Sequence, residues 1–245
     1  MADALQELKA RLATISDLNY AAGVLGWDQR TYMPPGGGPG RAEQLATLRS
    51  LAHQQFTDER IGQLLDELAP LAADDQSEDD DACLVRYVRR DYDKSRKLPT
   101  DFVQQLTRAR SIAQAVWEEA RRQSDFAMFQ PHLEKMFDFA KREADYLGYA
   151  EHPYDALLDQ YEPGMTTAQV KTLFAELKAG TVPFLKQIVA SGVEVDDSML
   201  HQPFDEARQE QFGVEITKKF GYDWSRGRQD RTVHPVAINF GPGDV

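Results

Sequence analysis

Hydrophobic side chains recur every three or four residues through most of the chain, which is the spacing of one face of an α-helix. The first stripe begins at Leu5 and continues to Leu25. The same spacing predicts further helices over residues 41–54, 58–68, 82–92, 99–120, 133–147, 167–178, 182–190 and 205–220. The pattern therefore predicts an all-α fold for most of the chain.

The periodicity changes after Tyr222. The last fifteen residues, RTVHPVAINFGPGDV, combine β-branched side chains with two prolines and two glycines. Residues 232–240 are the one convincing extended run, so they predict a short β-strand near the C-terminus. Pro235 has no backbone N–H to donate to a neighbouring strand, which makes this an edge strand.

Composition narrows the classes of function. The chain has 245 residues, 42% of them apolar, which suits one large domain or two small ones. Its net charge of −12 disfavours nucleic acid and anionic membranes as partners, because phosphate repels it. The most apolar window, LNYAAGVLGW, is shorter than a membrane span, and the start, MADALQELKARL, has no apolar core typical of a signal peptide.

Cysteine usage suggests a reducing compartment. Cys83 is the only cysteine of the sequence, so no disulfide can form within the chain, and we expect a cytoplasmic location. Cys83 lies within a helical stripe, where a small apolar role is more plausible than that of a nucleophile.

The stretch VLGWDQRTYMPPGGG places a carboxylate at a core-facing position. Extending the first apolar stripe leads to Asp28, while Trp27 points to another face. A buried carboxylate needs a partner, and Arg30 and Arg41 are the nearest candidates in sequence. Two interpretations stay open: an ion pair that ties the helix end to the following turn, or a wall residue of a buried polar site.

Two further features carry ionisable groups. Residues 154–166 hold Asp155, Asp159 and Glu162 at helical spacing, which we interpret as a solvated acidic face. His234 stands in the extended run, where either a structural role or contact with a ligand or substrate is possible. The five histidines include no pair at the spacing that binds zinc on a helix.

Several motifs occur together and in order. They are LGWDQRTYMPPGG, RAEQLATL, PYDALLDQYEPGMT, FGYDWSRGRQDRTVHP and FGPGDV. With these motifs the sequence closely resembles the carboxypeptidase Taq family of zinc metallocarboxypeptidases, over essentially the whole chain. Each motif is weak alone, whereas five in the same order are specific.

The resemblance implies a helical, two-lobed fold with a deep cleft, similar to the neurolysin and angiotensin-converting-enzyme architecture. It implies release of single residues from peptide C-termini with broad specificity, a homodimer, and a zinc (or cobalt) ion held by H-E-x-x-H and a downstream glutamate. The motif's glutamate would activate the metal-bound water. This sequence contains no H-E-x-x-H, so we expect neither catalytic residues nor metal ligands in it.

The same resemblance suggests that the chain is the N-terminal part of such an enzyme and inactive alone. Residues 1–75 would form the lid of the cleft, residues 76–221 the helical body, and residues 222–245 a strand and loop leading toward the zinc helix. If so, we expect apolar helix surface that a missing half would cover.

Individual residues follow from the motifs. His234, Pro235 and Val236 align with the family's H-P-F motif, with valine in place of phenylalanine, and Asp244 with Val245 resembles the start of its D-x-R-x-T motif. His234, Pro235 and Asp244 are therefore our candidates for substrate binding. The candidates for the cleft wall are Trp27, Asp28 and Arg41.

A second hypothesis is a non-catalytic helical module, derived from the family, that binds peptides or partners without cleaving them. Both hypotheses retain the helical core, so the hydrophobic periodicity does not distinguish them. Reading the gene beyond Val245 for an H-E-x-x-H motif would distinguish them.

Overall fold

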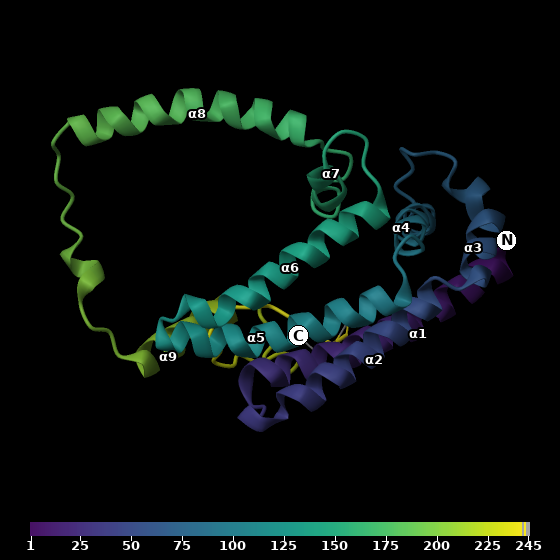
Figure 1. Cartoon of the computed structure of the whole chain (residues 1–245), viewed down its shortest axis with the longest axis horizontal. Helices are drawn as coiled ribbons and strands as arrows, with labels where there is room; N and C mark the ends of the chain where they lie inside the picture. The colour runs from purple at the N-terminus through teal and green to yellow at the C-terminus, as the bar shows by residue number, and fades with distance from the viewer. Residues whose placement is uncertain (242, 244–245) are drawn as a thin grey trace. The chain divides into compact units, whose positions relative to one another are not determined.

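The computed structural model describes residues 1–241 and 243, and within these residues it contains helices but no β-strand (Figure 1). None of the helices in this part of the chain has the length and apolar character needed to cross a bilayer. The α-helices are α1 (Ala2–Thr31), α2 (Gly38–Phe56), α3 (Glu59–Leu68), α4 (Asp80–Ser95), α5 (Thr100–Gln123), α6 (Phe126–Leu147), α7 (Pro153–Leu158), α8 (Thr167–Ala190) and α9 (Glu206–Lys219), and the 3₁₀ turns are η1 (Pro35–Gly37), η2 (Ala69–Ala72) and η3 (Ser198–His201).

The chain divides into two compact units. The first unit contains Met1–Gly148 together with the C-terminal segment that begins at Gln229, and the second unit contains Tyr149–Arg228. From the sequence we expect a different division of the chain, by roles around a cleft: residues 1–75, 76–221 and 222–245. Those roles stay a prediction.

Short-range side-chain caps explain why most helices begin where they do. The Asp58 carboxylate accepts a hydrogen bond from the N–H of Arg60 at 2.9 Å, which satisfies a donor that the first turn of α3 leaves free. Thr166 and Gln169 form a reciprocal capping box at the start of α8. Aspartates cap three further helices in the same way: Asp79, Asp125 and Asp205.

The larger buried cluster of the first unit joins α1, α3 and α4. Gly62 on α3 packs directly against the Tyr92 ring, because a Cβ at this position would lie 3.0 Å from the ring carbon Cζ. The cluster is therefore tight enough that a side chain at residue 62 would displace Tyr92. Its fully buried side chains include Leu8, Ile61, Leu64, Leu65, Leu68 and Tyr92.

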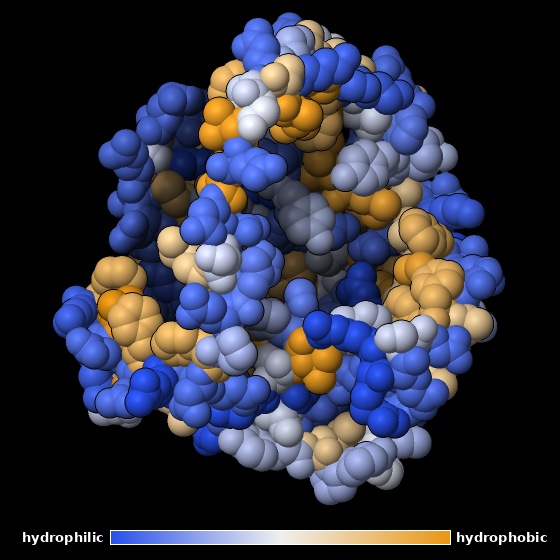
Figure 2. All heavy atoms as spheres, turned by 90° about the vertical axis from the view of Figure 1, so that its left-hand side faces the viewer, coloured by the Kyte–Doolittle hydropathy of each residue, from blue (hydrophilic) through white to orange (hydrophobic). Residues whose placement is uncertain are grey.

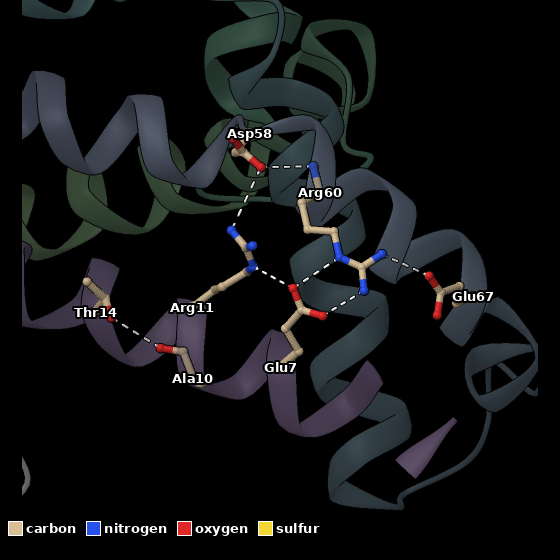
Figure 3. A network of polar contacts seen from close by, with 7 residues as sticks. All are labelled: Glu7, Ala10, Arg11, Thr14, Asp58, Arg60 and Glu67. Carbon is tan, nitrogen blue, oxygen red and sulfur yellow. Dashed lines mark hydrogen bonds and ion pairs between the residues drawn. The ribbon is translucent and has the colours of Figure 1, made fainter. Parts of the chain in front are cut away.

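An ionic network reinforces the contact between α1 and α3 (Figure 3). Glu7 accepts hydrogen bonds from Arg60 at 2.6 and 3.0 Å and from Arg11 at 3.0 Å. Arg60 also reaches Glu67 on its own helix at 3.1 Å. The hydrogen bonds from Arg60, and then those from Arg11, lower the pKa of Glu7 to about 2.

A second group of helices packs side by side in the first unit: α2 contacts both α1 and α5, and α6 packs on α5 (Figure 1). Phe102, Leu106, Ala109 and Phe139 form its buried cluster between α5 and α6. The Phe102 and Phe139 rings meet edge to face, with centroids 5.7 Å apart. This group of helices positions the cavity described below.

The prediction of two helices over residues 167–178 and 182–190 is wrong, because the structure contains one continuous helix, α8. Gly180 and Pro183 lie inside it. Proline removes one helical N–H and usually interrupts a helix. Here the residues around position 183 are all solvent-exposed, so no packed neighbour prevents water from hydrating the carbonyl that loses its partner.

Helix α8 buries none of its side chains within the described residues. Phe174, Phe184 and Val189 are 59%, 62% and 73% exposed. The expected exposed apolar surface is therefore present in the second unit. Figure 2 shows the molecule from the side of the segment between α8 and α9. Hydrophobic side chains lie at this surface among hydrophilic ones. The other large exposed apolar side chains of α8 are Leu173, Leu177, Val182, Leu185 and Ile188.

Candidate functional site

The C-terminal segment of the first unit docks on the end of α1 through Asp230. The Trp27 indole N–H donates to Asp230 Oδ2 at 3.0 Å, and the Tyr32 hydroxyl donates to Asp230 Oδ1 at 2.7 Å. The Trp27 ring also meets Phe240 edge to face at 6.2 Å. Two motifs that lie about two hundred residues apart in the sequence are thus in direct contact.

Residues 238–240 pack against α1 at Gly23. A Cβ on Gly23 would lie 3.4 Å from the Phe240 ring and 3.8 Å from the Ile238 side chain, which are ordinary van der Waals distances. The side chains of Phe240 and Ile238 therefore lie directly over this position of α1.

Asp28 is held by Arg41, as one of the two sequence interpretations predicts. Arg41 Nη2 lies 2.6 Å from Asp28 Oδ2, and Arg41 Nη1 donates to the Leu25 carbonyl at 2.5 Å. The side chains of Asp28 and Arg41 are 30% and 13% exposed, so the carboxylate is half-buried and its cation nearly buried. The pair ties the end of α1 to the start of α2.

His234 lies on α5. Its ring meets Trp117 edge to face, with centroids 6.1 Å apart. Arg121 donates to the Val233 carbonyl at 2.5 Å and lies over the Trp117 ring at 5.6 Å. A side chain of α5 therefore holds the backbone next to His234.

This arrangement corrects the prediction of a strand over residues 232–240. A strand forms only when its backbone pairs with a second extended segment. Within the described residues this segment is irregular, with bends at residues 233, 234 and 240, and it is held by side chains of α1 and α5.

A cavity of about 400 Å³ opens beside His234. The Arg30 guanidinium supplies positive charge, and the Gln114 amide and the His234 imidazole can each donate or accept a hydrogen bond. The indole of Trp117 adds an apolar surface. Such a mixture suits a small polar ligand with an apolar part. The lining residues are Arg30, Gln114, Trp117, His234, Pro235 and Val236.

The structure brings only some of the predicted site residues together. His234 and Pro235 line this cavity, whereas Trp27, Asp28 and Arg41 serve to fasten α1 to its neighbours. Asp244 lies outside the described residues. Their roles in substrate binding or in a cleft wall stay predictions.

Sequence reasoning missed the residues that complete the site. The sequence suggests Arg30 only as a partner of Asp28, whereas in the structure Arg30 lines the cavity. Gln114 and Trp117 stand in the middle of a regular helix, and nothing in the periodicity marks them. Asp230 could have been found, because it is a carboxylate within the FGYDWSRGRQDRTVHP motif.

Comparison with known proteins decides the family. The profile of the family described as carboxypeptidase Taq (M32) metallopeptidase matches residues 7–245. The chain belongs to the M32 family. The resemblance deduced from the motifs is thereby confirmed.

Relatives of this M32 chain share both sequence and fold. Carboxypeptidase 1 of Bacillus subtilis is 38% identical over 234 residues, covering 96% of this chain and 46% of the relative. Thermostable carboxypeptidase 1 of Thermus thermophilus is 40% identical, covering 98% of this chain and 48% of the relative. The BsuCP crystal structure is 37% identical with a TM-score of 0.92, covering 99% of this chain and 48% of that chain. The chain spans about half the length of the curated relatives it matches.

The M32 family implies a metal ion, but residues 1–241 and 243 contain no set of side chains that fits one. Among them, no group of three or more histidine, cysteine, aspartate or glutamate side chains comes together in a way that could hold a metal ion.

The acidic segment before α8 has a structural role. Asp155 accepts hydrogen bonds from the N–H of Thr167 at 2.6 Å and from its hydroxyl at 2.5 Å. These bonds lower the pKa of Asp155. Asp159 accepts from the N–H of Gly164 at 2.7 Å. The two carboxylates thus shape the turn between α7 and α8, which is more than the solvated face that we expected.

Proposed function

We propose that this chain works as part of a zinc-dependent metallocarboxypeptidase that releases C-terminal amino acids from peptides with broad specificity. The observation that supports this most is the shared fold, a TM-score of 0.92 at 37% identity over 99% of the chain. In this proposal the zinc or cobalt ligands come from the portion of the relatives that the chain does not span.

The first unit would then contribute one wall of the substrate-binding region. His234 and Pro235 border a cavity whose groups can hydrogen-bond a peptide, and broad specificity needs contacts to the peptide backbone more than to particular side chains. In this proposal the His234 imidazole either contacts a substrate carbonyl or supports the loop that does. Residues 1–75 would cover the cleft and residues 76–221 would form its body.

We extend the proposal to the setting in which the protein works. The net charge of −12 disfavours nucleic acid and anionic membrane as partners, and peptides are the partners that the family resemblance implies. Family resemblance suggests a homodimer, and the single cysteine suits a cytoplasmic location.

The experiment compares the 245-residue chain with the product of its gene read to the stop codon. Both are assayed on N-blocked dipeptides with added zinc or cobalt, and bound metal is measured by mass spectrometry. We expect the gene product to contain H-E-x-x-H, bind one catalytic metal per chain and release the C-terminal residue. A gene product that contains the motif and binds metal without releasing an amino acid would refute the proposed activity.

The second candidate is a peptide-binding module without catalysis, and the observation that favours it is the cavity beside His234, whose lining combines polar and apolar groups. A stop codon directly after Val245, together with peptide binding and no turnover, would establish it. Turnover by the 245-residue chain with one tightly held metal would refute both accounts of this chain.

A further inference from the structure

The backbone on both sides of His234 belongs to no helix or strand, so its path depends on contacts with other elements. Residues 229–239 are irregular, and no ladder of backbone hydrogen bonds holds them in place. Side chains hold this segment at Asp230, at Val233 and at residues 238–240. The position of His234 is therefore set by tertiary contacts.

Asp230 joins the beginning of the segment to the C-terminal end of α1. Each of its carboxylate oxygens accepts one hydrogen bond, Oδ2 from the Trp27 indole at 3.0 Å and Oδ1 from the Tyr32 hydroxyl at 2.7 Å. The Trp27 and Tyr32 rings meet edge to face at 5.6 Å, which keeps the two donors in one arrangement. Tyr32 is 60% exposed, whereas Trp27 and Asp230 are partly buried, so the bond from Trp27 is the better shielded from water.

The contact at Val233 comes directly before His234. Arg121 donates to the Val233 carbonyl and lies over the Trp117 ring, and the same ring meets the His234 imidazole edge to face at 6.1 Å. A single hydrogen bond to a carbonyl fixes one point of the backbone and leaves rotation about that point. A second fixed point is needed to define where the imidazole lies.

Asp230 supplies this second point. Four residues of fully extended chain span at most about 14 Å, so the anchored Asp230 limits the region that His234 can reach. The two donors of Asp230 belong to the end of α1, and Arg121 belongs to α5. The segment is thus fixed between two helices that also supply the opposite wall of the cavity beside His234.

That cavity depends on the anchor for its shape. Arg30 of α1 and Trp117 of α5 line it from regular helices, whereas His234 and Pro235 line it from the irregular segment. Groups that bind a ligand together must keep their relative positions within about 0.5 Å, which needs supporting contacts around them. The helices have such support from packing, and the irregular segment receives it through its anchors.

We propose that Asp230 is a positioning residue, which acts through Trp27 and Tyr32 to hold His234 in the wall of this cavity. A role of that position in peptide hydrolysis rests on the proposed function. The position itself can be measured without metal or turnover.

The first test is NMR of the histidine ring protons in the full 245-residue chain, without metal. The Trp117 ring shifts the resonances of the His234 protons beside it, so the signals of His234 report its position. We expect Asp230→Ala to move these signals toward those of an exposed histidine such as His201, and to leave the signals of His53 on α2 in place. The His234→Ala variant identifies the signals.

Milder substitutions give a graded result if Asp230→Ala fails to fold. Trp27→Phe keeps a ring and removes the better shielded N–H, so it should move the His234 signals less than Asp230→Ala does. Tyr32→Phe removes the exposed hydroxyl and should move them least. The matched control is Asp197→Asn, which removes an aspartate charge beside His201 in the second unit and should move the His201 signals alone.

The second test measures kcat/KM on the catalytically active gene product. Asp230→Ala should lower kcat/KM about fivefold or more, with metal content unchanged. Because Asp230 acts through His234, the double variant Asp230→Ala/His234→Ala should lie within about twofold of His234→Ala alone. A residue that merely stabilises the fold would instead lower kcat/KM independently, and the two losses would multiply.

Unmoved His234 signals in Asp230→Ala, equal movement by the Asp197→Asn control, or multiplying losses in the double variant would overturn the inference. The NMR outcomes leave the proposed peptidase activity standing, since they involve no turnover. Conversely, a gene product that binds metal without releasing an amino acid would refute the proposed function, and the NMR result would still decide whether Asp230 holds His234.

Discussion

Helices α1 and α8 are both long, with 30 and 24 residues, yet their surroundings differ completely. Helix α1 buries Leu8 and Ile15 against its neighbours and is fastened at both ends, by Glu7 near its start and by Asp28 near its end. Helix α8 buries no side chain within the described residues, although large apolar side chains follow its length.

The comparison shows that an apolar stripe predicts a helix but not its burial. Helix propensity and caps depend on residues close in sequence, and α8 has a complete capping box. Burial depends on a partner surface, which α1 finds in α2 and α3. Most helical stability in proteins comes from such packing.

The largest expected effect is a pair of identical substitutions, one in each region. Phe102→Ala on α5 removes a fully buried ring and should lower the free energy of unfolding by about 3–5 kcal/mol. Phe184→Ala on α8 removes a ring that is 62% exposed and should change it by less than about 0.5 kcal/mol. Urea denaturation followed by circular dichroism measures both.

If Phe102→Ala is too unstable to purify, Phe102→Leu replaces it as a milder test of the same site. A large loss of stability on Phe184→Ala would show that α8 is packed in solution, and the contrast between the two regions would be lost.

The next effect concerns the ion pair at the end of α1. Asp28→Ala leaves the nearly buried Arg41 with only the Leu25 carbonyl and the Gln44 side chain, so it should cost about 2–3 kcal/mol of stability. The control is Glu43→Ala, which breaks the more exposed pair between Glu43 on α2 and Arg108 on α5 and should cost much less. Equal losses in urea denaturation would contradict the structural role of Asp28.

A smaller effect is expected on catalysis when His234 is replaced. This test needs the catalytically active gene product. His234→Ala should lower kcat/KM at least about tenfold, equivalent to about 1.4 kcal/mol, with metal content nearly unchanged. His201→Ala, on an exposed turn of the second unit, serves as the control. Loss of metal would instead make His234 a ligand or its support, and full activity with a lower Tm would make its role structural.

The smallest effect is the pH dependence of the link between α1 and α3. Because the folded-state pKa of Glu7 is lowered from 4.5 to about 2, its contribution is fully present above pH 4.5 and is lost as the pH falls through about 2. Glu7→Gln should therefore flatten the fall in stability between these two pH values. Glu176→Gln on α8 is the matched control, and an equally flattened curve for it would remove Glu7 as the cause.

The sequence by itself determined the helical class, the family and most helix starts. These depend on residues within one or two turns of each other, such as Asp58 capping α3, or on motifs whose order can be read directly. The sequence predictions were wrong at two places, where the surroundings of a segment outweighed its local sequence preference. Pro183 lies inside the continuous helix α8, where the surrounding residues are exposed to solvent. Residues 232–240 pair with no second strand and are held by side chains of α1 and α5.

Only the tertiary structure decided which side chains meet. Asp230 joins Trp27 across about two hundred residues, and Arg30 of α1 lines one cavity together with Trp117 of α5 and His234. No periodicity contains such information, because each helix face is defined by spacing within the helix, while its partner is chosen by the packing of the whole unit. The sequence shows apolar stripes in both α1 and α8, but only α1 has α2 and α3 packed against it, and that packing makes its stripe part of a core.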